Sequence, residues 1–529
     1  MTPDALIIGS GPNGLAAAIT LAEAGRRVLV LEAASVPGGA VATEELTLPG
    51  FRHDTYSSVY PAGAASPVFA RMPLERHGLR WVHPEVCYAH PLPDGRAPAL
   101  YRDLDRTAAG LERFAPGDGE RWLGFAGPYV QRFAAFRSTI LGAFPPASGL
   151  TQLALQMRPR RLLELGRVLL MPAQALAEEL FAAPGSRAWL YGSAIHGDVG
   201  LTGAGSAIVA LGLNVLGHAV GWPSPEGGAG RLAGALVSYL ESLGGTVRCG
   251  ARVVEIGARG GRVTAVRIAS GETLPAELIV ADVMPRALVA LAGEALPPRY
   301  AAALRRYRPG PATLKVDWAL DGPIPWTAPE ARAAGTVHVG GSEDELLAAG
   351  SPGSKLPERP LMLLGQQSIA DPTRAPPGKH TAWAYTRGPQ ALDWERLRDR
   401  LVERMEAQVE RFAPGFREMI GARHVLGPGQ LERRNANLVG GDVGGGSYDL
   451  DQLIFRPVPA LAPYRTPLRG LYLASAATFP GGAVHGVAGR AAARLALAEE
   501  RMRTATRRFR PGGGLPGPPP GEGGECGRA

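Results

Sequence analysis

Residues 5–25 read ALIIGSGPNGLAAAITLAEAG, an apolar run, a group of glycines and a stretch of small apolar residues. ALII has the length and composition of a short buried strand. After the glycines, Leu15, Ile19 and Ala22 recur at helical spacing. RRVLVLEA follows and predicts another strand. Residues 4–33 are therefore expected to form a strand, a glycine turn, a helix and a second strand, which is the opening of an α/β fold.

Three glycines in this stretch, Gly9, Gly11 and Gly14, have the GxGxxG spacing of a dinucleotide-binding turn. The first permits the tight turn, the second lets backbone amides approach a pyrophosphate, and the third lets the helix pack closely on the strand. The phosphate charge would lie at the helix N-terminus, where free amides and the helix dipole stabilise it. A lone GxGxxG is weak evidence in a glycine-rich chain, and its place between a strand and a helix strengthens it.

An acidic residue and a glycine doublet narrow the choice of dinucleotide. Glu32 ends the second predicted strand, 18 residues after Gly14, where a carboxylate accepts hydrogen bonds from ribose hydroxyls and repels the 2′-phosphate of NADP. Gly38 and Gly39 allow a second close approach of the backbone to the same cofactor. Because FAD extends farther into a protein than NAD does, the doublet favours FAD as the bound cofactor.

Composition and charge limit the class of protein. With 529 residues the chain is long enough for two or three domains, and its 45% apolar and 20% charged residues are typical of soluble proteins. No apolar run reaches the ~18 residues of a membrane span, and the first residues do not resemble a signal peptide. The net charge of +8 comes mostly from arginines spread along the chain, which argues against a nucleic-acid partner. We expect a cytoplasmic protein, with contact to an anionic membrane surface and the oligomeric state left open.

The cysteines favour neither a metal site nor a redox disulfide. Cys87, Cys249 and Cys526 are far apart, and no CxxC occurs. We therefore expect no metal and no catalytic disulfide, with the thiols reduced.

Further patterns place strands and helices along the chain. RGGR at 259–262 predicts a hairpin turn, and alternating patterns predict strands at 313–320 and 380–386. Residues 394–412, WERLRDRLVERMEAQVERF, have the spacing of an amphipathic helix. Residues 470–500 repeat the order of strand, glycine-rich turn and helix. A nucleotide-type turn is thus predicted near both ends of the chain.

Several motifs resemble those of one known family. VLEA, PGGAVATEE, AELIVADVMP and the closing FPGGAVHGVAG look like the phytoene desaturase (carotenoid dehydrogenase) superfamily of FAD-dependent oxidoreductases. Within it, GFRHDTYSSVYP, TLKVDWALDGPIPW and SYDLDQLIFRP resemble the branch of the pyridine nucleotide-disulfide oxidoreductase domain-containing protein 2. The resemblance covers about residues 4–500. It implies an α/β fold, in which a FAD-binding Rossmann-like three-layer domain of the glutathione reductase or amine oxidase type carries an inserted substrate domain of mixed sheet and helices.

The same resemblance implies that the two domains interleave along the chain. The FAD-binding domain would be built from three separate segments, and the tail after it is rich in glycine and proline, which predicts disorder. The expected order is FAD-binding at 1–100, a helical cap at 101–225, FAD-binding at 226–295, substrate domain at 296–430 and FAD-binding at 431–500, with a disordered tail at 511–529.

Cofactor contacts follow from the resemblance position by position. The first three glycines would hold the pyrophosphate, the acidic residue the adenosine ribose, and the doublet the inner part of FAD. A valine would meet the adenine through its backbone, and the amides of the last helix would face the pyrimidine carbonyl of the flavin. The assigned positions are Gly9, Gly11, Gly14, Glu32, Gly38, Gly39, Val253, Ser475, Gly486 and Val487.

Two departures from the family pattern affect these expectations. Ala40 replaces an arginine that many relatives carry after the glycine doublet, which puts one phosphate contact in doubt. Ser475 and Phe479 replace glycine and histidine in the closing motif of the desaturases, which puts carotenoid desaturation in doubt. No redox CxxC and no second GxGxxG for a nicotinamide support the chemistry that the branch name suggests.

The catalytic candidates are Lys315 and His485. Lys315 lies in a stretch that resembles the strand bringing a lysine beside flavin N5 in related amine oxidases, and the alternative is an exposed strand lysine. His485 would lie beside the flavin helix, where packing is favoured over proton donation. His53 and Asp54 either line the site or stabilise a turn.

The leading functional hypothesis is a FAD-dependent oxidoreductase that transfers hydride to flavin from an apolar, isoprenoid- or carotenoid-like small molecule. The leucine-rich helices around residues 150–181, with their arginines, would either dip into a membrane surface to collect this substrate or form an ordinary cap. The alternatives are a flavin amine oxidase, a polyene reductase or ketolase, and a non-enzymatic escort protein that binds prenylated partners.

Overall fold

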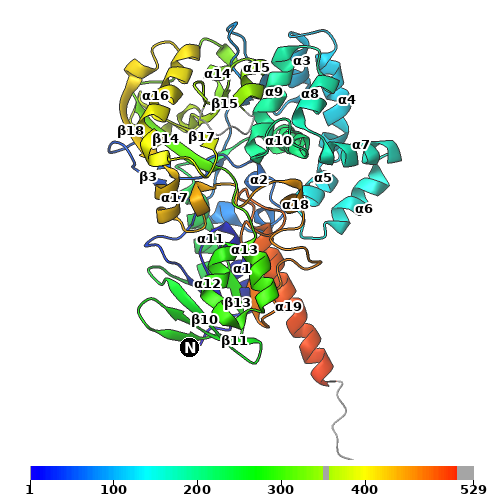
Figure 1. Cartoon of the computed structure of the whole chain (residues 1–529), viewed down its shortest axis with the longest axis vertical. Helices are drawn as coiled ribbons and strands as arrows, with labels where there is room; N and C mark the ends of the chain where they lie inside the picture. Colours follow the sequence, from blue (N-terminus) through cyan, green and yellow to red (C-terminus); the bar gives the residue numbers. More distant parts are fainter. Residues whose placement is uncertain (1, 350–356, 509–529) are drawn as a thin grey trace, which may run out of the picture.

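The computed structural model describes residues 2–349 and 357–508, and the tail predicted to be disordered, 511–529, lies outside the described residues. Two large sheets organise the described part of the chain, one in its lower half and one in its upper half in Figure 1. The long last helix runs along the lower half and extends beyond it.

The first sheet is parallel and has five strands in the order β19-β13-β1-β2-β9. The predicted opening unit forms its centre, as β1, helix α1 and β2. Along β1, Ala5 and Ile7 pack on one side of the sheet and Leu6 and Ile8 on the other, as the two-residue period of a strand requires. The strands are β1 (Ala5–Ile8), β2 (Val28–Leu31), β9 (Thr246–Arg248), β13 (Ile279–Ala281) and β19 (Leu471–Leu473).

Each side of this sheet is covered by a further layer. Three helices pack against one side, and an antiparallel three-stranded sheet with two helices packs against the other. This three-layer arrangement confirms the predicted fold class. The covering elements are α1 (Pro12–Glu23), α11 (Gly230–Ser242) and α19 (Val487–Arg508) on one side, and β10 (Val253–Arg259), β11 (Arg262–Ile268), β12 (Thr273–Pro275), α12 (Pro285–Ala292) and α13 (Pro298–Arg305) on the other.

The second sheet is mixed and has seven strands in the order β18-β14-β17-β16-β15-β6-β7. The amphipathic helix α16 (Trp394–Phe412) covers it, with Leu401, Met405 and Val409 packed in the shared core. The strands are β6 (Val86–Ala89), β7 (Ala99–Leu100), β14 (Ala312–Leu320), β15 (Ala334–Val339), β16 (Met362–Gly365), β17 (His380–Gly388) and β18 (Ile420–Leu426).

One predicted segment boundary differs from the structure. Strands β6 and β7 lie inside the segment 1–100 that was assigned to FAD binding, but they extend the seven-stranded sheet. The physical reason is parallel pairing of β6 with β15, in which Val86 lies opposite Ala334. Such pairing joins segments about 250 residues apart and leaves no local sequence signal.

Eight helices between the two halves of the chain form the predicted helical cap. Their core is aromatic, with Trp122, Trp189 and Tyr129 fully buried. No helix in the described ranges 2–349 and 357–508 is both long and apolar enough to cross a membrane. The cap helices are α3 (Leu104–Glu112), α4 (Asp118–Gln131), α5 (Phe133–Ile140), α6 (Ala147–Gln156), α7 (Pro159–Leu170), α8 (Ala173–Leu180), α9 (Pro184–Ala194) and α10 (Ser206–Val220).

Short elements complete the fold around these layers. Two of them, β3 and β4, pair as a small hairpin after the glycine doublet, with Thr43 opposite Asp54. The short elements are β3 (Thr43–Glu44), β4 (His53–Asp54), α2 (Pro61–Ala64), β5 (Trp81–Val82), β8 (Ser224–Pro225), α14 (Pro329–Arg332), α15 (Glu343–Ala349), α17 (Pro428–Arg434) and α18 (Leu450–Leu453).

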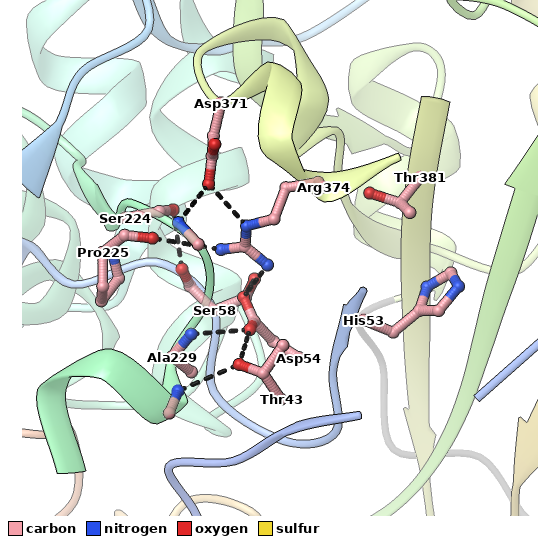
Figure 2. A network of polar contacts seen from close by, with 12 residues as sticks. Thr43, His53, Asp54, Ser58, Ser224, Pro225, Ala229, Asp371, Arg374 and Thr381 are labelled. Atoms are coloured by element: carbon pink, nitrogen blue, oxygen red, sulfur yellow. Dashed lines mark hydrogen bonds and ion pairs between the residues drawn. The ribbon is translucent and has the colours of Figure 1, made fainter. Parts of the chain in front are cut away.

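A buried ion network, here called the Arg374 network, joins β4 to the substrate domain (Figure 2). The guanidinium of Arg374 lies 3.0 Å from a carboxylate oxygen of Asp54 and 2.8 Å from one of Asp371. Asp54 also accepts hydrogen bonds from the hydroxyls of Thr43 and Ser58 and from a backbone amide. Because these groups come from separate segments, the network holds the inner ends of both domains together.

Candidate functional site

A large cavity of about 1440 Å³ runs from the N-terminus of α1 to one face of the seven-stranded sheet. Pockets for one small molecule usually enclose about 300–1,000 Å³, so this cavity has room for a dinucleotide and a second molecule. Its wall includes the opening glycine turn, the ends of β2 and β13, the segment 428–438, the closing glycine turn and side chains of β14, β15 and β17.

The opening turn forms one end of this cavity. Gly9, Gly11 and Asn13 line it, and the N-cap residue Gly11 offers no side chain to the amides of α1. A Cβ on Gly11 would come within 2.7 Å of a carboxylate oxygen of Asp282, and one on Gly14 would clash with the carbonyl oxygen of Gly9. The glycines therefore leave a helix N-terminus open to an anion, as the pyrophosphate assignment requires.

Asp282, directly after β13, is a residue at this end that the sequence reasoning did not single out. It is buried, lines the cavity and accepts a hydrogen bond from the amide of Gly14 at 2.9 Å. Burial raises its pKa to about 7, against the opposing effect of the Gly14 amide. A signal existed, because an acidic residue that ends a strand beside β1 lies at the carboxyl edge where ligands of such sheets bind.

Glu32 also lines the cavity, at the carboxyl end of β2. One of its oxygens accepts hydrogen bonds from the amide and hydroxyl of Ser10, and the other accepts from the amide of Ala34. A carboxylate can accept about four hydrogen bonds, so capacity remains for a ribose hydroxyl. In the doublet, Gly39 lines the cavity, whereas Gly38 lies behind it and donates its amide to Ser10.

The cationic side chains on the cavity wall compensate for Ala40, which lines the cavity where many relatives carry arginine. Arg252 and Arg433 both line the wall and, among the described residues, neither has a carboxylate partner. Arg252 precedes Val253, whose backbone was expected to meet the adenine and which also lines the cavity. Two unpaired guanidinium groups on the wall fit a ligand that carries a pyrophosphate.

The closing turn meets the cavity slightly earlier than expected. Ser475 and the range 482–484 line the wall, but Gly486 and Val487 do not. His485 is absent from the wall as well, and its ring nitrogen Nδ1 accepts a hydrogen bond from the amide of Val487 at 3.1 Å. Burial lowers the pKa of His485 to about 4, so the ring is neutral. The geometry gives this histidine a role in shaping the start of α19.

The opposite wall is a face of the seven-stranded sheet. Lys315 lies there with only 3% of its surface exposed, so the alternative of an exposed strand lysine is wrong. Its neighbours on the wall are Tyr385, directly opposite on β17, and Thr313. His53 and Asp54 do not line the cavity, and the two residues belong to polar clusters behind it.

A protein-family model described as flavin containing amine oxidoreductase matches residues 13–497. The chain belongs to this family. The match spans the glycine turns at both ends of the chain and the sheet that carries Lys315 between them. It confirms the recognised superfamily, and it makes the chain an FAD-dependent oxidoreductase.

Individual relatives in the flavin-containing amine oxidoreductase family agree with this assignment. Pyridine nucleotide-disulfide oxidoreductase domain-containing protein 2 of Rattus norvegicus is 29% identical, with 93% of each chain covered. The lycopene-forming phytoene desaturase of Pseudescherichia vulneris is 25% identical and covers 94% of this chain and 99% of its own. Among solved structures, an oxidoreductase from Methanosarcina mazei shares the fold with a TM-score of 0.63 and 16% identity, covering 94% of this chain and 99% of that one.

The residues present fit FAD in three ways. Glycines without Cβ atoms open the helix N-terminus, the Glu32 carboxylate keeps accepting capacity, and Arg252 and Arg433 are unpaired. When bound, FAD supplies a two-electron acceptor for the substrate. The chain itself binds the cofactor, keeps water away from the inner cavity and presents Lys315 at its buried end.

Proposed function

We propose that this enzyme oxidises an apolar, isoprenoid-like substrate by hydride transfer to its flavin. The carrying observation is the composition of the cavity's inner end, where Val209, Leu213 and Trp222 of the cap face the sheet wall. Apolar walls of this kind suit a substrate with few hydrogen-bonding groups. The likeness to a phytoene desaturase supports the same substrate class.

In this proposal the protein positions the substrate, and Lys315 holds a proton at its Nζ atom beside the reacting carbon. Hydride transfer needs a dry site, because water competes for the reactive groups. The cap supplies that dryness by placing buried aromatic and aliphatic side chains over the sheet wall. The Glu32 carboxylate and the glycine turns hold the distal part of the cofactor.

The outer helices of the cap provide a route for collecting such a substrate. None of the residues of α6 and α7 lines the cavity, but Leu155 on α6 is 82% exposed and Leu163 on α7 is 76% exposed. Arg158 and Arg160 lie between them in the chain and are also exposed. Exposed leucines flanked by arginines suit contact with an anionic lipid surface, and we retain this contact as a proposal.

The substrate class is tested by anaerobic reduction of the bound flavin. Purified holoenzyme is mixed with polyenes, amines and hydroxy compounds, and loss of the oxidised flavin absorbance is followed. The proposal expects bleaching by polyenes or related isoprenoids. Bleaching by amines alone would contradict the substrate class and leave the flavin chemistry intact.

A second candidate, a flavin amine oxidase, is favoured by the position of Lys315. A lysine buried on the cavity wall is the arrangement that the resemblance to amine oxidases leads one to expect. Release of hydrogen peroxide with amines and no bleaching by isoprenoids would select this alternative.

The cofactor site has its own test at Glu32. Replacing a carboxylate that accepts from ribose costs about 1.5–3 kcal/mol, which corresponds to FAD affinity at least tenfold weaker in Glu32→Ala. The matched control is Glu45→Ala, which removes an exposed carboxylate nearby that does not line the cavity. Equal FAD dissociation constants in the two variants, measured by flavin fluorescence, would contradict the ribose role.

A further inference from the structure

The buried end of the cavity carries an ammonium group that has a partner behind the wall. Lys315 and Asp317 are two residues apart on β14, so their side chains share one face of the sheet. The ammonium of Lys315 donates a hydrogen bond to Asp317 Oδ1. Lys315 lines the cavity, whereas Asp317 is fully buried and does not.

A histidine continues this line away from the cavity. His53 Nδ1 lies 3.7 Å from Asp317 Oδ1, and His53 Nε2 lies 2.7 Å from the hydroxyl of Thr47. His53 is buried, but Thr47 belongs to a partly exposed loop. The polar groups therefore lead from the cavity wall to the surface without a break longer than 3.7 Å.

Two atoms in the middle of this line have no hydrogen-bond partner. They are His53 Nδ1 and Asp317 Oδ2, and both are inaccessible to solvent. Buried polar atoms are almost always paired in folded proteins, so an unpaired pair of this kind needs a reason. The gap of 3.7 Å is about 0.5 Å beyond the range of an N–H···O bond, and a small rotation of either side chain closes it.

We propose that Lys315, Asp317, His53 and Thr47, here called the Lys315 path, conduct a proton between the cavity and the protein surface. The inference rests on the proposed oxidation. Removing two electrons from a C–H bond delivers a hydride to the flavin and releases one proton from the substrate. That proton passes from Lys315 Nζ to Asp317, then to His53 Nδ1, and leaves from His53 Nε2 through Thr47.

The charges around the path keep its members exchangeable. Burial raises the pKa of Asp317 to about 6, and Lys315 opposes this rise while Asp54 and Glu44 add to it. Burial lowers the pKa of His53 to about 3, with further lowering by Lys315, His424 and Arg374.

Those directions suit proton passage. A neutral imidazole has one N–H donor and one acceptor nitrogen, so it can take a proton on one side and release a proton on the other. A histidine that stayed charged at rest would lack the acceptor. The raised pKa of Asp317 likewise lets its carboxylate accept a proton at near-neutral pH.

The path is tested with photoreduced holoenzyme and dioxygen, so that no substrate needs to be known. Reoxidation passes two electrons to dioxygen and yields hydrogen peroxide, which needs the proton of the hydride and one proton from the solvent. Stopped-flow mixing in weak buffer follows flavin absorbance for the electrons and an indicator dye for proton uptake. We expect the two signals to coincide in the natural protein.

The expected result is proton uptake slowed about tenfold or more in Asp317→Asn and His53→Gln, so that it lags behind flavin reoxidation. The matched control is His424→Gln, because His424 lies directly opposite Asp317 on β18 and is half-buried. It should keep the uptake rate of the natural protein. If a path variant loses flavin, Thr47→Val tests the same exit from the surface side and should slow uptake.

Two outcomes would overturn the path. Proton uptake at the natural rate in the variants that retain flavin would show that these side chains do not carry the proton. A loss in His424→Gln as large as that in His53→Gln would remove the assigned exit. Natural protein without bound flavin would instead contradict the proposed function.

Discussion

The Arg374 network and the Lys315 path lie next to each other behind the cavity and use neighbouring residues of one short strand. His53 and Asp54 are consecutive on β4, so their side chains point to opposite sides (Figure 2). Asp54 meets Arg374, and His53 faces Asp317. One dipeptide therefore serves two clusters with different properties.

The two clusters differ in how completely their polar groups are paired. In the Arg374 network, every carboxylate oxygen of Asp54 and Asp371 accepts at least one hydrogen bond. In the Lys315 path, Asp317 Oδ2 and His53 Nδ1 have no partner. A fully paired network rigidifies the fold, whereas an unpaired donor and acceptor held at short range are costly and point to function.

The largest effect is expected from breaking the Arg374 network. Arg374→Met leaves two buried carboxylates without their cation, which should lower the free energy of unfolding by about 3–5 kcal/mol. Urea unfolding of the holoenzyme measures the loss. The control is Arg80→Met, because Arg80 forms an exposed ion pair with Glu226 and its loss should leave the midpoint nearly unchanged. Equal losses in both variants would show that the network does not support the fold.

The next effect concerns Asp282, which resembles the Lys315 path in its burial. Its pKa of about 7 in the folded protein lies above its unfolded value of about 3.9, so its contribution to stability is present at low pH and is lost as the pH rises through 7. The apoprotein should lose at most about 4 kcal/mol from this group between about pH 4 and pH 8.

Asp282→Asn removes that ionisation and should make the fall in stability shallower. Asp198 and Asp317, whose pKa values burial raises to about 6, keep part of the slope. Asp371 gives the opposite sign, because its pKa is lowered and its contribution is lost as the pH falls. Thermal unfolding across this pH range measures the slope, and parallel curves for the two proteins would contradict the burial argument.

The smallest effect compares two threonines of the same loop region. Thr43 donates to Asp54 and accepts from the amide of Gly230, so Thr43→Val should cost about 1–3 kcal/mol. Thr47, in the Lys315 path, is partly exposed, and Thr47→Val should change the free energy of unfolding by no more than about 0.5 kcal/mol. A larger loss for Thr47→Val than for Thr43→Val would reverse the contrast between the clusters.

The local patterns of the sequence predicted much of the framework. The GSGPNG turn, its flanking strands and helix, the hairpin at 259–262 and the helix at 394–412 depend on neighbouring residues, so periodicity and glycine spacing suffice for them. Glu32 and Lys315 were singled out from their strands, and both lie on the cavity wall. The boundary at residue 100 failed because β6 finds its partner about 250 residues later.

What the sequence by itself determined was therefore the dinucleotide turn, the flavin family and the order of the segments. Tertiary structure alone decided which polar residues meet. Asp54 and Arg374 are 320 residues apart, and His53 reaches Asp317 across a similar separation. No local pattern records such distances, because pairing of buried charges depends on where whole sheets pack. The separation of a structural network from a proton path within one dipeptide arises at that level.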